Sequence, residues 1–432
     1  MAAISGKAGI GPSAVTRSQF FLLYAAMLVA AAGNTALQSV MPAIGRTIGM
    51  PDLLVVMSFS WSAVLWVLLA PYWAAKSDRH GRKLLTIVGV AGFVAAMLLC
   101  GVALLAGLHG WIGPAMTFAL FALFRSAYGA LGCATPSATQ AYLASKTRRS
   151  GRVVALSGLS SSFSLGTIIG PAVAPLFVLP FLGLSGPLFA FTLIGAAVLI
   201  AIARWLPDDR SGRRVGRGAA MSYPSLASPP TGASVVAATA PRRSRRLKWN
   251  DSRIRLWIIA GVIAGHAQAA ALTSLGFFII DRLGLEPSRA EGPISIVMMA
   301  GAAATLAAQW GLIPRLSLGP RALILWGSII AAAGLVMTVA SSDLYGITLG
   351  FSVACLGFGF TRPGFTAGAS LAVPLAEQGA VAGVVTAANG ISFVLAPTLG
   401  IALYTLQHSL PFTVSAALLL LFVAFGGRWL KT

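Results

Sequence analysis

The chain of 432 residues is strongly apolar: hydrophobic residues make up 57% of it, charged residues 9%, and the mean hydropathy is +0.84. This composition excludes a single soluble core of ordinary proportions and predicts an all-α integral membrane protein. The formal charge of +21 is compatible with nucleic acid binding. However, the basic residues cluster at the ends of apolar segments, so we expect no nucleic acid partner.

Twelve apolar segments are long enough to cross a membrane as helices, because a hydrocarbon core about 30 Å thick takes roughly 20 residues per crossing. Their apolarity is continuous, whereas the strands of a barrel would alternate. Residues 1–17 are polar and the apolar run after them is long, so no cleavable signal peptide is expected. The expected helices are 18–44, 53–75, 84–107, 111–140, 153–178, 186–206, 254–280, 290–313, 322–341, 343–371, 379–404 and 411–427.

The basic residues predict the orientation of these helices. With alternating orientation, 26 of the 31 Lys and Arg lie on one side of the membrane; Arg46, Arg282 and Arg289 lie on the other, and Arg125 and Arg362 lie within helices. Positive charge collects on the cytoplasmic side. We therefore expect a multi-pass protein of the inner (plasma) membrane with both termini in the cytoplasm.

The longest connection between helices divides the chain into two halves. Residues 207–253 are rich in Arg, Ser, Pro, Ala and Gly without helical periodicity, which predicts a disordered cytoplasmic linker whose Arg clusters either set the topology or contact anionic membrane lipid. Residues 18–206 and 254–428 then form two six-helix bundles, flanked by cytoplasmic segments 1–17 and 429–432.

The two halves share traces of a repeat. Aligning Pro136 with Pro363 also aligns Gly132 with Gly359 and Thr139 with Thr366, and Gly170-Pro171 has a counterpart in Ala396-Pro397. Repeats of this kind are typical of secondary transporters, which bind substrate between the repeats near the middle of the membrane.

Three motifs stand in the expected order. The turn after the second helix reads AAKSDRHGRK (residues 74–83), the fourth helix carries Arg125 and Gly129, and the fifth carries Gly166, Gly170 and Pro171. In these motifs the chain resembles the major facilitator superfamily, and within it the twelve-helix drug:proton antiporter branch. The resemblance covers nearly the whole chain and implies two six-helix bundles related by pseudo-twofold symmetry.

The resemblance implies a cytoplasmic gating loop formed by Asp78, Arg79, Gly81, Arg82 and Lys83. It places the Asp78 carboxylate at the start of the eleventh helix, near residues 379–380, where the helix dipole favours an anion. The chain departs from the family after the fourth helix, where 145–146 read Ser-Lys in place of an acid that pairs with this loop in relatives.

Charges within the membrane are costly and call for a function. Arg125 matches the motif Arg that is linked to proton transfer in the family. Arg362 either lines the cavity or extends its side chain to the membrane surface. All ten Asp and Glu fall at helix ends or in loops. The candidates for the proton carrier are therefore His266 in the seventh helix and the acids Asp281 and Glu291 at the outer mouth.

In the family, the first, fourth, seventh and tenth helices line the substrate cavity. Polar residues on these helices are candidate ligands, although polar side chains also hold membrane helices together. Asn34 and Gln38 are four residues apart and share a helix face. The remaining candidates are Tyr128, His266, Gln268 and Thr361, with Gln309 on the eighth helix and Asn389 on the eleventh.

The sequence thus predicts a monomeric transporter without enzymatic activity, metal or cofactor. Its three cysteines are interpreted as packing residues within helices, and a nucleotide-binding loop of the form GxxxxGK[ST] does not occur. The favoured function is proton-coupled efflux of small amphipathic compounds or drugs. The alternatives are a symporter or facilitator for uptake of an organic solute, and a membrane sensor or scaffold that transports nothing.

Overall fold

The computed structural model describes residues 16–146, 152–208, 250–374 and 377–426. Residues 209–249 of the expected linker and the expected terminal segments 1–15 and 429–432 lie outside these ranges. Within them, ten helices are long and apolar enough to cross a membrane, and two shorter apolar helices occupy residues 161–177 and 410–426. The chain is thus a multi-pass membrane protein.

In the described residues of the first half, seven α-helices form six successive apolar segments. They are α1 (Arg17–Ile48), α2 (Asp52–His80), α3 (Arg82–Leu108), α4 (Pro114–Ala127), α5 (Ala134–Lys146), α6 (Arg152–Val173) and α7 (Gly186–Trp205). The π-helical turn η2 (Tyr128–Gly132) joins α4 to α5 in one crossing, and the 3₁₀ turn η3 (Ala174–Phe177) extends α6.

The second half repeats this pattern. Its helices are α9 (Arg255–Leu283), α10 (Glu291–Leu306), α11 (Ile313–Leu316), α12 (Pro320–Ala340), α13 (Leu344–Leu371), α14 (Gln378–Leu406) and α15 (Leu410–Leu421). The π turn η6 (Ala307–Leu312) joins α10 to α11, η8 (Phe422–Gly426) extends α15, and the short 3₁₀ turn η5 (Pro287–Arg289) precedes α10.

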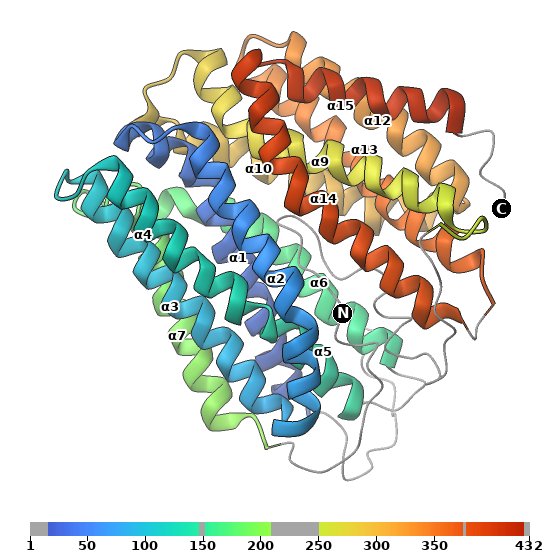
Figure 1. Ribbon diagram of the computed structural model, residues 1–432, viewed down its shortest axis with the longest axis horizontal. Helices are drawn as coiled ribbons and strands as arrows, with labels where there is room; N and C mark the ends of the chain where they lie inside the picture. The colour runs from blue at the N-terminus through green and yellow to red at the C-terminus, as the bar shows by residue number, and fades with distance from the viewer. Residues whose placement is uncertain (1–15, 147–151, 209–249, 375–376, 427–432) are drawn as a thin grey trace.

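Figure 1 shows the two halves as separate groups of helices, α1–α7 in blue to green and α9–α15 in yellow to red. The groups meet where α2 contacts α14, α6 contacts α10, and α1 contacts α9 and α10. We call the end where α1 leads into α2 the α1–α2 end, and the opposite one the α2–α3 end. Toward the α2–α3 end, α2 and α14 diverge (Figure 1).

The predicted apolar segments are helical, but one boundary was wrong. The charged stretch 76–83 was expected to be a turn, whereas α2 continues through His80 and α3 begins at Arg82. Gly81 makes the connection alone, with φ 94° and ψ 143°, a backbone conformation that favours glycine. Charged residues can extend a helix beyond the apolar layer, so the end of hydrophobicity did not mark the end of the helix.

Candidate functional site

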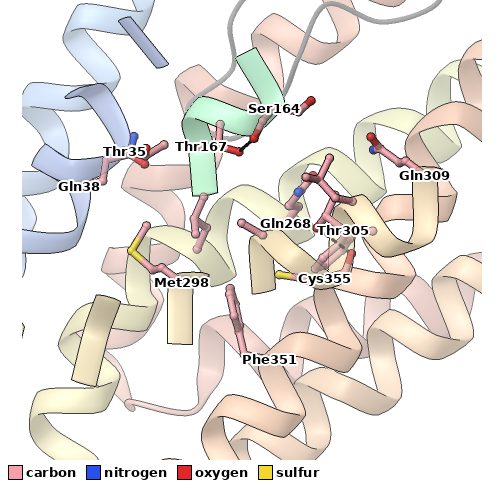
Figure 2. Close-up of a pocket in the computed structure, with 14 residues that line it drawn as sticks. Thr35, Gln38, Ser164, Thr167, Gln268, Met298, Thr305, Gln309, Phe351 and Cys355 are labelled. Carbon is pink, nitrogen blue, oxygen red and sulfur yellow. Dashed lines mark hydrogen bonds between the residues drawn. The ribbon is translucent and has the colours of Figure 1, made fainter. Parts of the chain in front are cut away.

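A cavity of about 660 Å³, including its open mouth, lies between the two halves. Helices α1 and α6 form one wall, and α9, α10, η6 and α13 form the other (Figure 2). We call it the central cavity. Its fourteen lining residues are Thr35, Gln38, Ser164, Thr167, Gln268, Leu272, Met298, Ala302, Thr305, Leu306, Gln309, Phe351, Cys355 and Phe358.

The lining of the central cavity is neutral. Seven of its side chains are polar hydroxyls or amides, the others are apolar, and none is charged. Thr35 Oγ1 donates to Ala31 O (3.0 Å), and Thr305 Oγ1 donates to Gly301 O (3.1 Å). By contrast, both amide atoms of Gln38 are buried without a hydrogen-bond partner in the described part of the chain. The cavity can therefore offer hydrogen bonds and apolar contact to a ligand, but no countercharge.

A second cavity, of about 470 Å³ including its open mouth, shares three lining residues with the first: Gln38, Leu272 and Met298. The rest of its wall is mainly apolar, with Val55, Val56 and Phe59 of α2 and Phe277 of α9 among the lining residues. Because α1 ends and α2 begins on this side, the second cavity extends from the central cavity toward the α1–α2 end. The three shared side chains form the boundary between the two cavities.

Charged residues link the halves beyond the second cavity. Arg46 near the end of α1 pairs with Asp52 of α2 (2.8 Å) and, in the other half, with Asp281 of α9 through both guanidinium nitrogens, one of them at 2.8 Å. Tyr404 of α14 donates a hydrogen bond to Asp281. These four residues are here called the Arg46 cluster. Its guanidinium also lies 5.4 Å from the ring centre of Phe277, so the cluster covers the second cavity.

Two further contacts join the halves at the α1–α2 end. Thr398 of α14 donates to Ser60 of α2 across the interface (2.9 Å). Gly276 of α9 packs against Pro42 of α1 so closely that an added Cβ would lie 2.5 Å from the proline Cγ. The α1–α2 end is therefore closed by the close packing of α9 against α1 and by a hydrogen bond between α14 and α2, as well as by the ion pairs of Arg46.

The expected fifth-helix motif lies against α1. A Cβ at Gly166 would lie 2.4 Å from Leu28 O, and one at Gly170 would lie 2.2 Å from Ala32 O. Both positions thus require glycine for the close crossing of α6 and α1, and Pro171 is buried beside them. Since Thr35 and Thr167 line the central cavity from these two helices, the crossing fixes one wall of the cavity.

Arg125 is buried in the first half, 1% exposed. Its guanidinium lies between the rings of Phe59 (4.8 Å) and Tyr128 (4.5 Å) and donates to Asn34 Oδ1. These contacts stabilise a buried cation through ring faces and an amide oxygen. Asn34 and Tyr128 were expected in the cavity, but the structure places them around Arg125, outside the set that lines the central cavity.

Other predicted cavity and charge-coupling residues lie outside the central cavity. Thr361 is buried in α13 and donates to Phe358 O (3.1 Å), and Asn389 is buried in α14. The Nδ1 atom of His266 is 2.8 Å from Val262 O on its own helix, and Arg362 is half-buried in α13. Of the predicted ligands, Gln38, Gln268 and Gln309 line the cavity.

The predicted gating loop is described only in part. The side chains of Asp78 and Arg79, and those at 379–380, lie outside the described residues. Arg82 is buried at the start of α3, and Lys83 Nζ is 3.8 Å from Oδ1 of Asp208, which lies just after the end of α7. The expected contact of this loop with α14 thus stays a prediction.

The sequence reasoning missed the Arg46 cluster. It treated Arg46 as an exception to the charge pattern and Asp281 as a possible proton carrier. The available signal was local: Arg46 and Asp52 flank the short α1–α2 turn and are six residues apart. The pairing of Arg46 with Asp281 spans 235 residues and could be recognised only from the fold.

One carboxyl group at the α1–α2 end is buried. Glu291, in the first turn of α10, is 4% exposed and accepts a hydrogen bond from Ser295 Oγ (2.8 Å). It is absent from the ion pairs found among the described residues, whereas Asp281 is held by Arg46. The two acids predicted at the outer mouth therefore have different surroundings: Asp281 is paired with a cation, and Glu291 is buried beside a hydroxyl.

Comparisons with known proteins identify the family. The model of the Major Facilitator Superfamily matches residues 23–397. The chain belongs to this superfamily. Among curated proteins, none matches this chain significantly by sequence.

Solved structures agree in fold with this facilitator. The human organic anion transporter MFSD10 (TETRAN) aligns with a TM-score of 0.63 and 17% identity, covering 96% of this chain and 99% of that one. A variant of the nucleoside transporter NupG aligns with a TM-score of 0.67 and 12% identity, covering 96% of this chain and all of the other. Membership of the superfamily identifies the protein as a membrane transporter rather than an enzyme, and these structures show its fold.

Proposed function

We propose that this protein is an antiporter that exports small amphipathic compounds in exchange for protons. In this proposal, residues 18–206 and 254–428 are the two bodies that rock against each other, and the central cavity is the substrate site. The observation that carries the proposal is the central cavity between the halves, with the Arg46 cluster closing the path on one side. A site that is closed at one end is what alternating access requires.

One observation supports the class of substrate, and a second supports export over uptake. The lining combines phenylalanine, methionine and leucine with neutral polar groups, which suits an amphipathic compound. Gly166 and Gly170 contact α1 as closely as the helix-five pattern of exporters implies. The two structural neighbours act on organic anions and nucleosides according to their names. Because this fold serves unlike solutes, the substrate must be argued from the cavity itself.

The proposed orientation places the α2–α3 end in the cytoplasm. The Lys and Arg residues concentrate at that end and in the long connection between α7 and α9, as positive-inside topology requires. The Arg46 cluster then closes the outer side, and the substrate enters the central cavity from the cytoplasm. We propose a monomer in the inner membrane.

Glu291 is the proposed proton carrier. Burying a carboxylate without a cation costs several kcal/mol, whereas a protonated carboxyl that hydrogen-bonds to a hydroxyl is tolerated. Glu291 has such a partner in Ser295, while Asp281 must be ionised to hold Arg46. His266 is turned to its own helix through Val262 O.

The test is flux through proteoliposomes with an acid lumen. Adding neutral and quaternary ammonium amphiphiles one at a time, we expect lumenal pH to rise when the transported compound is added and to stay constant in empty vesicles. Glu291→Gln is expected to abolish the pH change while the labelled compound still equilibrates; Glu286→Gln, an exposed acid at the same end, is the control. Joint movement of solute and protons in one direction would instead establish symport.

The gating loop is tested in the same vesicles. Asp78→Asn removes the charge proposed to hold the cytoplasmic side closed in one state. It is expected to reduce turnover strongly at unchanged abundance, since contacts of an acid with a helix start contribute about 0.3–1 kcal/mol and bias a balanced equilibrium. Wild-type flux at equal abundance would contradict this role.

A further inference from the structure

The central cavity also limits the class of compound it can hold, an inference that rests on the proposed function of this site. None of its fourteen lining residues carries a charge. The nearby cation Arg125 is enclosed by Phe59, Tyr128 and Asn34. Because a charged group loses hydration on entering such a site and gains no countercharge, the cavity favours a ligand that is neutral when bound.

The hydrogen-bond donors in the cavity are unevenly available. The hydroxyls of Thr35, Thr167 and Thr305 already donate to backbone carbonyls, at 3.0 Å, 2.7 Å and 3.1 Å. They retain lone pairs and therefore act toward a ligand as acceptors. Hydrogen-bond donors are offered by the side-chain amides of the glutamines, which reach the cavity from both walls (Figure 2).

Gln38 is the most informative of these amides. Its Oε1 and Nε2 atoms are both buried, and neither has a partner in the described part of the chain. A buried amide without partners destabilises the empty site. A ligand that forms hydrogen bonds with both amide atoms therefore gains more binding free energy than a single solvent-exposed hydrogen bond would contribute. Gln38 also lies at the boundary of the two cavities, where a moving substrate must pass.

The chemistry of a carboxamide defines its complement. It presents an acceptor and a donor side by side, and it binds in bidentate fashion to an edge that presents a donor next to an acceptor, as glutamine does with the adenine edge. Lactams, primary carboxamides and ureas have such an edge. The apolar part of the ligand would contact Leu272, Met298 and Phe351, and the flexible Met298 adapts to different shapes.

We infer that the substrates of this facilitator are neutral amphipathic compounds with an adjacent hydrogen-bond donor and acceptor of the amide or lactam type. The Gln38 amide binds this pair, Gln268 faces it from the other half, and the apolar residues of α9, α10 and α13 hold the hydrophobic part. Because residues of both halves bind the substrate, occupancy of the cavity is linked to the movement of one half relative to the other.

The test uses three compounds with one scaffold: a phenyl-substituted pyrrolidinone, its N-methyl derivative, and the corresponding pyrrolidine, which is a cation at neutral pH. Binding to the purified full chain is measured by calorimetry. We expect the lactam to bind about 5-fold to 30-fold more tightly than the N-methyl compound, the effect of one to two neutral hydrogen bonds. The cation should bind more weakly than the lactam.

Variants assign this preference to Gln38. Gln38→Met preserves side-chain size and is expected to lower lactam affinity about 5-fold to 30-fold. It should lower the affinity of the N-methyl compound less, since only the carbonyl of that compound can bond to the Gln38 amide. Gln407→Met changes a glutamine that lies outside the central cavity and serves as control. Gln268→Met is a second variant, used if the first does not fold.

Equal affinity for the lactam and its N-methyl derivative, stronger binding of the cation, absence of lactam binding, or unchanged lactam affinity in the glutamine variants would each overturn this inference. Its failure is distinguishable from failure of the proposed function. Proton exchange for the pyrrolidinium ion would retain the exporter and refute the substrate class. Lactam binding without proton-linked flux would retain the substrate class and refute the exporter.

Discussion

Asp281→Asn tests whether the Arg46 cluster holds the α1–α2 end closed. The substitution keeps the shape of the side chain but removes its charge and one of the two acceptor atoms. Arg46 then loses an ionic partner in the second half, although it keeps Asp52 in the first. The change therefore weakens the link between the halves while leaving the pair within the first half.

The size of the effect follows from the contacts. Hydrogen bonds to charged groups contribute about 1.5–3 kcal/mol each. The side chains of Arg46 and Asp281 are 19% and 23% exposed, so solvent reduces the effect toward the lower figure. A loss of about 1.5 kcal/mol changes the ratio of closed to open molecules roughly tenfold.

The assay measures access to the second cavity. Val56, which lines it and is 3% exposed, is replaced by cysteine in a chain whose three native cysteines have been substituted. We expect Asp281→Asn to raise the rate of labelling by an impermeant maleimide about tenfold from the α1–α2 side. Glu286→Gln, in an exposed pair at the same end, should leave it unchanged. An unchanged rate in a folded Asp281→Asn protein would refute the role given to the cluster.

Three further outcomes are expected. Gly276→Val places a side chain where Pro42 lies 2.5 Å from an added Cβ, and should raise the same labelling rate. Gly170→Ala forces α6 away from α1 and should cost about 1–3 kcal/mol, seen as a lower apparent melting temperature with reduced flux; an unchanged melting temperature would contradict it. Hydrogen bonds from Arg253 lower the pKa of Asp251 to about 2. A lowered carboxyl pKa stabilises the folded state above the ordinary value near 4, and this contribution is lost as pH falls toward 2. The difference in melting temperature between wild type and Asp251→Asn should therefore be constant from pH 8 to pH 5 and shrink below about pH 4; a difference that already changes near pH 6 would contradict it.

The helices could be predicted closely because one physical quantity, the thickness of the hydrocarbon layer, determines their length and apolarity. The α6 glycines could be predicted for a related reason, since close crossing of membrane helices requires small residues at a fixed spacing. The end of α2 could not be predicted in this way. Charged residues 76–80 leave the apolar layer without leaving the helix, and Gly81 is the residue that ends it.

The cavity was harder to predict because lining, core and lipid-facing positions use the same side chains. Met298 and Phe351 could face any of these environments, and Thr35 forms the helix-backbone hydrogen bond of an ordinary packing residue. Gln38 and Gln268 were predicted because they are polar residues on helices that line the cavity in the family the chain resembles, and Gln309 was predicted as a polar residue of the eighth helix. Asn34 is also an amide in an apolar helix, but it accepts a hydrogen bond from Arg125, a contact that only the fold reveals.

Reciprocal access at two positions tests the central claim most directly. Thr305→Cys reports on the central cavity from the α2–α3 end, and Val56→Cys reports on the second cavity from the α1–α2 end. Alternating access predicts that Asp281→Asn lowers labelling of the first cysteine while it raises labelling of the second. If labelling rises at both positions, or changes at only one, the two halves do not exchange between opposite open states and the account is wrong.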